Sequence, residues 1–169
     1  MKRRLFAILL IALLLCGCGG KTESDEPARS AAPDCTFYDL GGNAHTLSEF
    51  AGKPVILNFW ASWCGPCKSE MPDLEAAYKE YGEEIHFILV NLTDGKSETV
   101  ESASGYIAGQ GYTFPVYYDT DMSGALAYQV TSIPITYFID AEGNVVAYAS
   151  GMMSAARLQN GIDLLLGKE

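Results

Sequence analysis

The sequence has few basic residues, few cysteines and no long apolar run. It holds 11 lysines and arginines against 21 aspartates and glutamates, which gives a formal net charge of −10 at pH 7. A chain this acidic offers no positive face to phosphates, and this excludes nucleic acid as a main partner. Its 5 cysteines are too few for a small domain held together by disulfides. Because 49% of the residues are hydrophobic, the 169 residues still predict one packed domain with tails.

The first residues have the pattern of an export signal. Lys2, Arg3 and Arg4 are followed by an uncharged apolar run over residues 5–15. That run is too short to cross a bilayer as a helix, which takes about 20 residues. A buried N-terminal helix would need a polar face, and the run supplies none. We therefore expect residues 1–17 to be a signal peptide that is removed from an extracytoplasmic protein.

The end of this signal, Leu15-Cys16-Gly17-Cys18, resembles a bacterial lipobox. The resemblance implies cleavage just before a cysteine that then receives lipid. Cys18 fits this role better than Cys16, because Gly17 is small whereas Leu15 is bulky. Acyl chains on Cys18 would hold the protein on the bacterial cell membrane, since each buried methylene contributes about 0.8 kcal/mol. Plain secretion with free cysteines near the terminus is the alternative.

The rest of the chain has the pattern of a tether followed by an α/β domain. Residues 18–33 are polar and contain proline, so we expect a flexible tether before a domain over residues 34–169. Apolar runs at 54–60 and 85–92 predict central strands covered on both faces. We also expect a β-hairpin over 36–40 and 44–47, strands at 114–118, 135–140 and 145–149, and helices at 65–81, 97–108, 123–128 and after Ser154. This order predicts a sheet with helices on both faces.

The most informative segment joins the first central strand to its helix. Cys64 and Cys67 flank Gly65 and Pro66 at the expected start of that helix. Unpaired backbone N–H groups and the helix dipole favour a thiolate there, and a thiolate is the species that attacks a disulfide. A structural zinc site usually needs four ligands, and Cys35 and the two histidines lack the spacing for it. We therefore expect a reactive dithiol and no metal, with a purely structural disulfide as the alternative.

Three segments carry a resemblance to a known family. Residues 58–72, NFWASWCGPCKSEMP, resemble the active-site segment of thioredoxin-fold proteins, in the version found in TlpA/ResA-type extracytoplasmic thiol-disulfide oxidoreductases. Residues 130–140 resemble the segment that carries the family's cis proline, here Pro134. Residues 32–54 are similar to the added N-terminal β-hairpin of these proteins. The resemblance implies a thioredoxin fold, a central mixed sheet with helices on both faces, extended by that hairpin.

The resemblance also implies a role for each matching residue. Cys64 would be the exposed nucleophile that attacks a substrate disulfide, and Cys67 would resolve the mixed disulfide. Pro134 would shape the groove in which the backbone of Ile133 pairs with an extended substrate. The residues expected to bind substrate are Trp63, Gly65, Pro66 and Ile133. Trp60 either lines the site or belongs to the core.

The chain departs from cytosolic thioredoxins at the group expected to transfer protons. Their buried aspartate in the strand before the motif is replaced here by Asn58, which cannot titrate. TlpA/ResA-type proteins often carry an acidic residue after the next strand instead, and Asp94 is the nearest match. We expect Asp94 to be a buried carboxylate near the thiols with a raised pKa. The alternative is that Asp94 caps the next helix or turn. Cys35 is expected to be a small buried or partly exposed residue and not a third redox centre.

The expected function is that of a monomeric, membrane-anchored thiol-disulfide oxidoreductase without a cofactor. The Gly-Pro pair between the cysteines resembles that of reducing thioredoxins, which favours reduction of disulfides in extracytoplasmic proteins. The family implies a membrane thiol carrier as electron donor, and cytochrome c maturation or repair of secreted proteins as tasks. A peroxiredoxin-like peroxidase would need a threonine where Ala61 stands. A copper chaperone of related fold would need a different cysteine spacing and a suitably placed histidine.

Overall fold

The computed structural model describes residues 30–168, built around an eight-stranded sheet in the order β1-β8-β7-β4-β5-β6-β2-β3. The expected signal peptide, Cys18 and most of the expected tether lie outside these residues. The strands are β1 (Ser30–Ala31), β2 (Thr36–Tyr38), β3 (Ala44–Thr46), β4 (Val55–Trp60), β5 (His86–Asn91), β6 (Val116–Tyr118), β7 (Ile135–Ile139) and β8 (Asn144–Ser150). The helices are η1 (Leu47–Phe50), α1 (Gly65–Tyr81), α2 (Val100–Gln110), α3 (Ser123–Ala127) and α4 (Ala155–Leu166).

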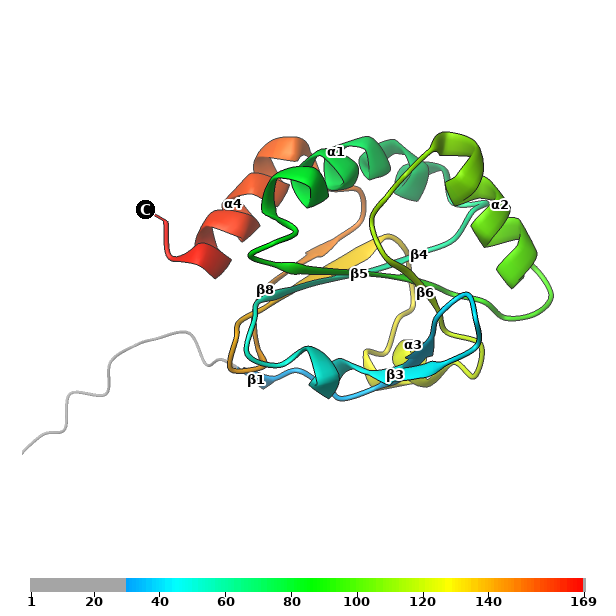
Figure 1. Ribbon diagram of the computed structural model, residues 1–169, viewed down its shortest axis with the longest axis horizontal. Coiled ribbons are helices and arrows are strands. Elements are labelled where there is room, and N and C mark those ends of the chain that lie inside the picture. The colour runs from blue at the N-terminus through cyan, green and yellow to red at the C-terminus, as the bar shows by residue number, and fades with distance from the viewer. Residues whose placement is uncertain (1–29, 169) are drawn as a thin grey trace, which may run out of the picture.

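The sheet is mixed and has helices on both faces. β4, β5 and β6 run parallel, whereas β7 and β8 are antiparallel neighbours of β4 and of each other. Helices α1, α2 and α4 cover one face, and α3 and the N-terminal strands lie on the other side (Figure 1). No helix within residues 30–168 is long and apolar enough to cross a membrane.

Strand β4 lies at the centre because both of its faces are apolar. All six of its residues are buried. Successive side chains of a strand point to opposite faces, so Ile56 and Trp60 pack in the core beneath the three longer helices. Leu57 and Phe59 pack in a second core on the other face. Asn58 therefore points into the first core, between apolar neighbours, where its amide needs hydrogen-bond partners.

The helix boundaries follow from capping side chains. The predicted helix over residues 65–81 is confirmed, with Cys64 as its N-cap. Ser154 caps α4 as predicted and accepts a hydrogen bond from the backbone N–H of Arg157 at 3.3 Å. Helix α2 begins later than predicted, at Val100, because Thr99 and Ser102 form a capping box there.

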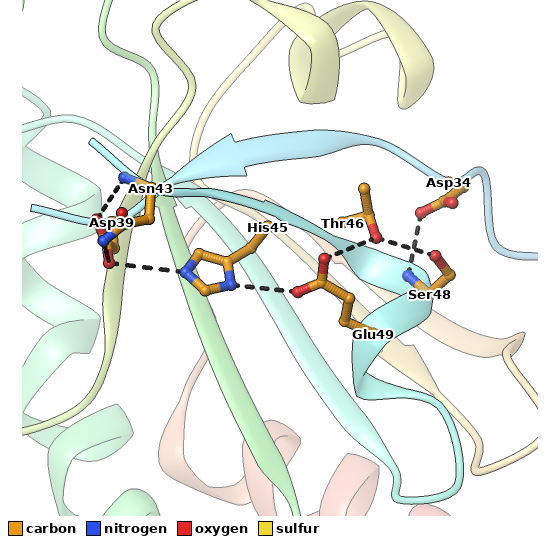
Figure 2. A network of polar contacts seen from close by, with 7 residues as sticks. All are labelled: Asp34, Asp39, Asn43, His45, Thr46, Ser48 and Glu49. Carbon is orange, nitrogen blue, oxygen red and sulfur yellow. Dashed lines mark hydrogen bonds and ion pairs between the residues drawn. The ribbon is translucent and has the colours of Figure 1, made fainter. Parts of the chain in front are cut away.

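The predicted N-terminal hairpin is confirmed and extends the sheet at one edge, where β2 pairs with β3 and with β6. Polar side chains join this hairpin to η1 (Figure 2). The ring of His45 lies between the carboxylates of Glu49, at 3.2 Å, and Asp39, at 3.7 Å. At the other edge Ser30 pairs with Val145 of β8, so the sheet begins within the segment that the sequence assigns to the tether.

Candidate active site

The two cysteines of the motif form a disulfide at the start of α1. Their Cα atoms are 5.3 Å apart. The backbone N–H of Cys67 donates to Sγ of Cys64 at 3.2 Å, because Cys64 occupies the N-cap position. Unpaired N–H groups of the first helical turn and the helix dipole favour negative charge at this sulfur. In the reduced form, Cys64 is therefore the sulfur that these groups stabilise as a thiolate.

The exposure of the two cysteines differs from the sequence prediction. Cys64 is only 4% exposed and Cys67 is 1% exposed, so the expectation of an exposed nucleophile is wrong for the disulfide form. Trp63 is instead the exposed side chain beside the disulfide, with 59% of its surface accessible. Gly65 and Pro66 are exposed as well. The accessible surface at the disulfide is therefore formed by Trp63, Gly65 and Pro66, and little of Cys64 itself is accessible.

An open groove of about 270 Å³ lies next to Cys64, and its lining is formed by Trp63, Leu92 and residues 130–133. The carbonyl oxygen of Ile133 is 3.8 Å from Sγ of Cys64. The peptide bond between Ile133 and Pro134 is cis. The structure therefore brings together Cys64, Cys67, Trp63, Ile133 and Pro134, as the resemblance implied, although they come from two distant parts of the chain.

Asp94 does not have the surroundings that the sequence analysis expected. It is exposed and accepts hydrogen bonds from the hydroxyl and backbone N–H of Ser97 and from the N–H groups of Lys96 and Glu98. The Ser97 hydroxyl, followed by the backbone donors, holds the pKa of Asp94 well below its usual range. A raised pKa would require burial, so this expectation is wrong, and the alternative of a turn-capping residue describes Asp94.

A different carboxylate lies buried on the same helix as the dithiol, one turn after Cys67. Glu70 follows Cys67 by three residues, which places both on the same face of α1. It is 2% exposed and accepts hydrogen bonds from Nδ2 of Asn58 at 2.9 Å and from the backbone N–H of Met153 at 2.8 Å. Burial raises the pKa of Glu70, although these two donors act in the opposite direction.

Sequence reasoning missed Glu70, although a signal for it was available. The apolar stripe of α1 runs through Met71 and Leu74, and Cys67 begins that stripe at helical spacing. Glu70 falls within the same stripe, so the helical period places this glutamate toward the core. A charged residue at a core position of a helix that carries a reactive motif is a candidate for proton transfer.

Glu98 is a second buried acid that the sequence analysis missed. It is 1% exposed and lies just before α2. Its carboxylate accepts hydrogen bonds from the backbone N–H of Ser62, from the Ser62 hydroxyl at 2.9 Å and from the Ser102 hydroxyl. The hydrogen bonds of Glu98 thereby connect Ser62, in the loop before Trp63 and Cys64, with Ser102 at the start of α2.

Cys35 and Trp60 belong to the core. Cys35 is a free cysteine, 4% exposed, in the core on the sheet face opposite α1. Burial, together with nearby aspartates, raises the pKa of its thiol to about 12, so it is not a thiolate at neutral pH. Trp60 is 0% exposed. Within residues 30–168 no group of three or more histidine, cysteine or acidic residues is arranged to hold a metal ion.

Comparisons with known proteins agree with this geometry. Residues 27–162 match the family model described as Redoxin. The chain is 34% identical over 177 residues to the thiol-disulfide oxidoreductase ResA of Bacillus subtilis, covering 97% of this chain and 94% of that protein. A putative thiol:disulfide interchange protein DsbE from Chlorobium tepidum has a TM-score of 0.72 and 29% identity, covering 82% of this chain and 97% of that one. The exposed lipoprotein thioredoxin of Streptococcus pneumoniae has a TM-score of 0.66 and 32% identity, covering 77% of this chain and 98% of that one.

Proposed function

The chain belongs to the Redoxin family, has a thioredoxin fold and is a thiol-disulfide oxidoreductase, and from this premise we propose that it is a lipid-anchored reductant of disulfides in extracytoplasmic proteins. The observation that carries this proposal is the Cys64–Cys67 disulfide at the start of α1, with Cys64 lying 3.8 Å from the carbonyl oxygen of Ile133. An extended substrate that pairs with this backbone would bring its own disulfide against Cys64.

Reduction takes place in two exchange steps. The Cys64 thiolate attacks one sulfur of the substrate disulfide, so a bond from Cys64 to that sulfur forms and the substrate S–S bond breaks. The released substrate thiolate takes up a proton. Cys67 then loses its proton and attacks Sγ of Cys64, which releases the second substrate thiolate and forms the disulfide seen in the structure. Two electrons pass from the dithiol to the substrate, and a membrane thiol donor restores the dithiol.

Glu70 is the group that we assign to the proton of Cys67. It is buried, lies on the same helix face as Cys67, and burial raises its pKa. A carboxylate in such a place can take the Cys67 proton directly or through one water as Cys67 attacks. This assignment replaces Asp94 in the proposed site, which otherwise consists of Cys64, Cys67, Trp63, Pro134 and the backbone of Ile133.

The anchor and the direction of electron flow rest on the sequence. The Leu15–Cys18 segment favours lipidation of Cys18, and the similar pneumococcal protein is described as an exposed lipoprotein. The Gly-Pro pair between the cysteines favours reduction, which suits cytochrome c maturation or the repair of secreted proteins. Plain secretion is therefore not part of the proposal. The protein would act as a monomer on the outer side of the cell membrane.

A trapping experiment tests the proposed function. Cys67→Ser in the full chain removes the resolving thiol, so substrate proteins should remain bound to Cys64 and appear as adducts on non-reducing gels. Dithiothreitol should release them. Cys64→Ser is the matched control and should trap nothing, while the reduced wild-type protein should reduce insulin disulfides. Adducts that form equally well with Cys64→Ser, or a dithiol that leaves insulin intact, would overturn the proposal.

A further inference from the structure

The side chain that faces the Glu70 carboxylate from β4 is the amide of Asn58, and not an acid. We propose that Asn58 is a positioning residue that holds this carboxylate in place and controls its proton exchange with Cys67, and that Thr136 fixes the orientation of the amide. The proposal rests on the role assigned to Glu70 above. It concerns a residue that touches neither the substrate nor the reacting sulfurs, and acts through Glu70.

The hydrogen bonds leave the Asn58 amide one orientation. Nδ2 of Asn58 donates to Oε1 of Glu70 at 2.9 Å and to Oγ1 of Thr136 at 2.9 Å. The two amide hydrogens are thus both used, and an ionised carboxylate can only accept. If the amide were turned over, its oxygen would face the carboxylate oxygen. The three side chains are 1%, 2% and 1% exposed, so solvent does not replace a lost partner.

The Asn58 amide also stabilises the ionised form of Glu70. The second carboxylate oxygen, Oε2, accepts from the backbone N–H of Met153 at 2.8 Å, so both oxygens are held by donors. The donors to the carboxylate are thus the Asn58 amide from β4 and the Met153 N–H from the segment before α4, while Thr136 of β7 contacts the amide and not the carboxylate. The charged group that acts on it from its own helix is Asp73, which raises the pKa of Glu70, and Cys67 lies three residues before it on the same helix face. The Asn58 donor therefore opposes both burial and Asp73 by stabilising the anion.

This arrangement matters when Cys67 resolves the mixed disulfide. The Cys67 proton must pass to a base while Sγ of Cys67 bonds to Sγ of Cys64 and the substrate thiolate leaves. Only ionised Glu70 can accept that proton, and it returns the proton to the solvent afterwards. A carboxylate at position 58 would change this, because two acids at hydrogen-bond distance share one proton at neutral pH. The amide at position 58 keeps Glu70 available as a base.

The first test measures the titration of Glu70 itself. NMR of the carboxyl carbon in the oxidised full chain should show an Asn58→Asp midpoint at least about one pH unit above that of wild type. At pH values below both midpoints, single-turnover resolution should slow by about tenfold, since a rise of one unit in the pKa of a base lowers its ionised fraction tenfold there. Thr136→Val removes the acceptor that orients the amide and should shift the midpoint in the same direction by less. Thr136→Ser keeps a hydroxyl and should restore the wild-type midpoint.

A swap of the two groups provides the sharper test. Glu70→Gln alone should remove the pH-dependent limb of resolution, because no buried base remains. Adding Asn58→Asp restores one carboxylate and one amide in exchanged positions, and part of the limb should return. An unchanged Glu70 midpoint in Asn58→Asp, or a double variant as flat as Glu70→Gln, would overturn the inference. If Asn58→Asp does not fold, as judged by circular dichroism, the Thr136→Val and Thr136→Ser midpoints decide, and equal midpoints overturn it.

Failure of the proposed function would look different from failure of this inference. If Glu70→Gln resolves mixed disulfides like wild type at every pH, Glu70 is not the base and the inference fails with it. Insulin reduction and trapping through Cys67→Ser would still support the oxidoreductase. If the dithiol exchanges no disulfide at all, the proposed function fails, whereas the NMR midpoint of Glu70 still reports on Asn58.

Discussion

At the scale of single residues, Asp94 provides a test that separates a capping carboxylate from a catalytic one. Its carboxylate collects donors from residues 96–98, which fixes the turn before α2. Asp94→Ala should lower the melting temperature by a few degrees, because those donors lose their partner. Stopped-flow resolution of the mixed disulfide between pH 5 and 9 should keep its wild-type profile. Glu70→Gln is the matched variant that should change the profile, and a changed profile in Asp94→Ala would return Asp94 to the site.

The residue scale also shows what the sequence could and could not provide for the site. Cys64, Cys67 and their place at a helix start follow from a local motif, because the spacing and the helix signals lie within a few residues. Glu70 lies in the same segment, but its partners Asn58 and Met153 come from other elements. A carboxylate reveals its pKa only through burial and partners, so a chain-order argument favoured Asp94 instead.

At the scale of secondary-structure elements, Glu75 joins α1 to the segment before β6. It is 7% exposed, and its oxygens accept from the Thr113 backbone N–H at 2.9 Å and the Thr113 hydroxyl at 2.7 Å. Lys79 lies 3.0 Å away on the same helix. Burial alone would raise the pKa of Glu75, but these hydrogen bonds outweigh it and lower the pKa to about 2. The ionised carboxylate therefore holds two elements together.

Glu75→Gln should lower the free energy of unfolding by about 2 kcal/mol near neutral pH, because charge-assisted hydrogen bonds are lost. The folded-state pKa lies below the unfolded-state value, so the contribution is fully present above the unfolded pKa and is lost as pH falls toward 2. Urea unfolding at pH 6 and pH 3 should show the difference between wild type and variant shrinking. Lys79→Gln, which removes only an exposed partner, should cost less than 1 kcal/mol. An equal difference at both pH values would contradict this account.

The elements themselves were largely predictable because their signals are local. Apolar runs predicted β4 and β5, the two short segments around residues 41–43 predicted the N-terminal hairpin, and Ser154 predicted the start of α4. The pairing of Ser30 with Val145 was not predictable, because a two-residue strand in a polar segment has no hydrophobic period to mark it. The start of α2 was placed too early because Asp94 holds the N–H groups of residues 96–98 in a turn. The helix begins only after this turn, at the capping box of Thr99 and Ser102.

At the scale of the whole molecule, strand β1, with which the described residues begin, and the dithiol lie at opposite ends of the central strands. Ser30 of β1 pairs with Val145, which is level with Ile139 and with Val55 at the start of β4. The dithiol follows the other end of β4, about 20 Å away for a strand of this length. Figure 1 shows β1 on a different side from the junction of β4 and α1. A chain that runs from a lipid anchor to β1 would therefore enter the domain at the end opposite the dithiol.

The anchor itself gives the prediction at this scale. The protein is acidic, and the charged side chains that would be lost with residues 1–17 are all basic. Anionic lipids would therefore repel the remaining chain, so electrostatic attraction cannot hold it on a membrane. In the proposed function, membrane association therefore depends on the acyl chains of Cys18. Cys18→Ala should block processing or release the protein from the detergent phase, whereas Cys16→Ala, which changes a residue of the signal, should do neither. Detergent partitioning and the mass of the mature N-terminus measure both variants. If the Cys18 variant stays with the membrane in processed form, the protein is held there by something other than lipid at this position, and the proposed anchor is wrong.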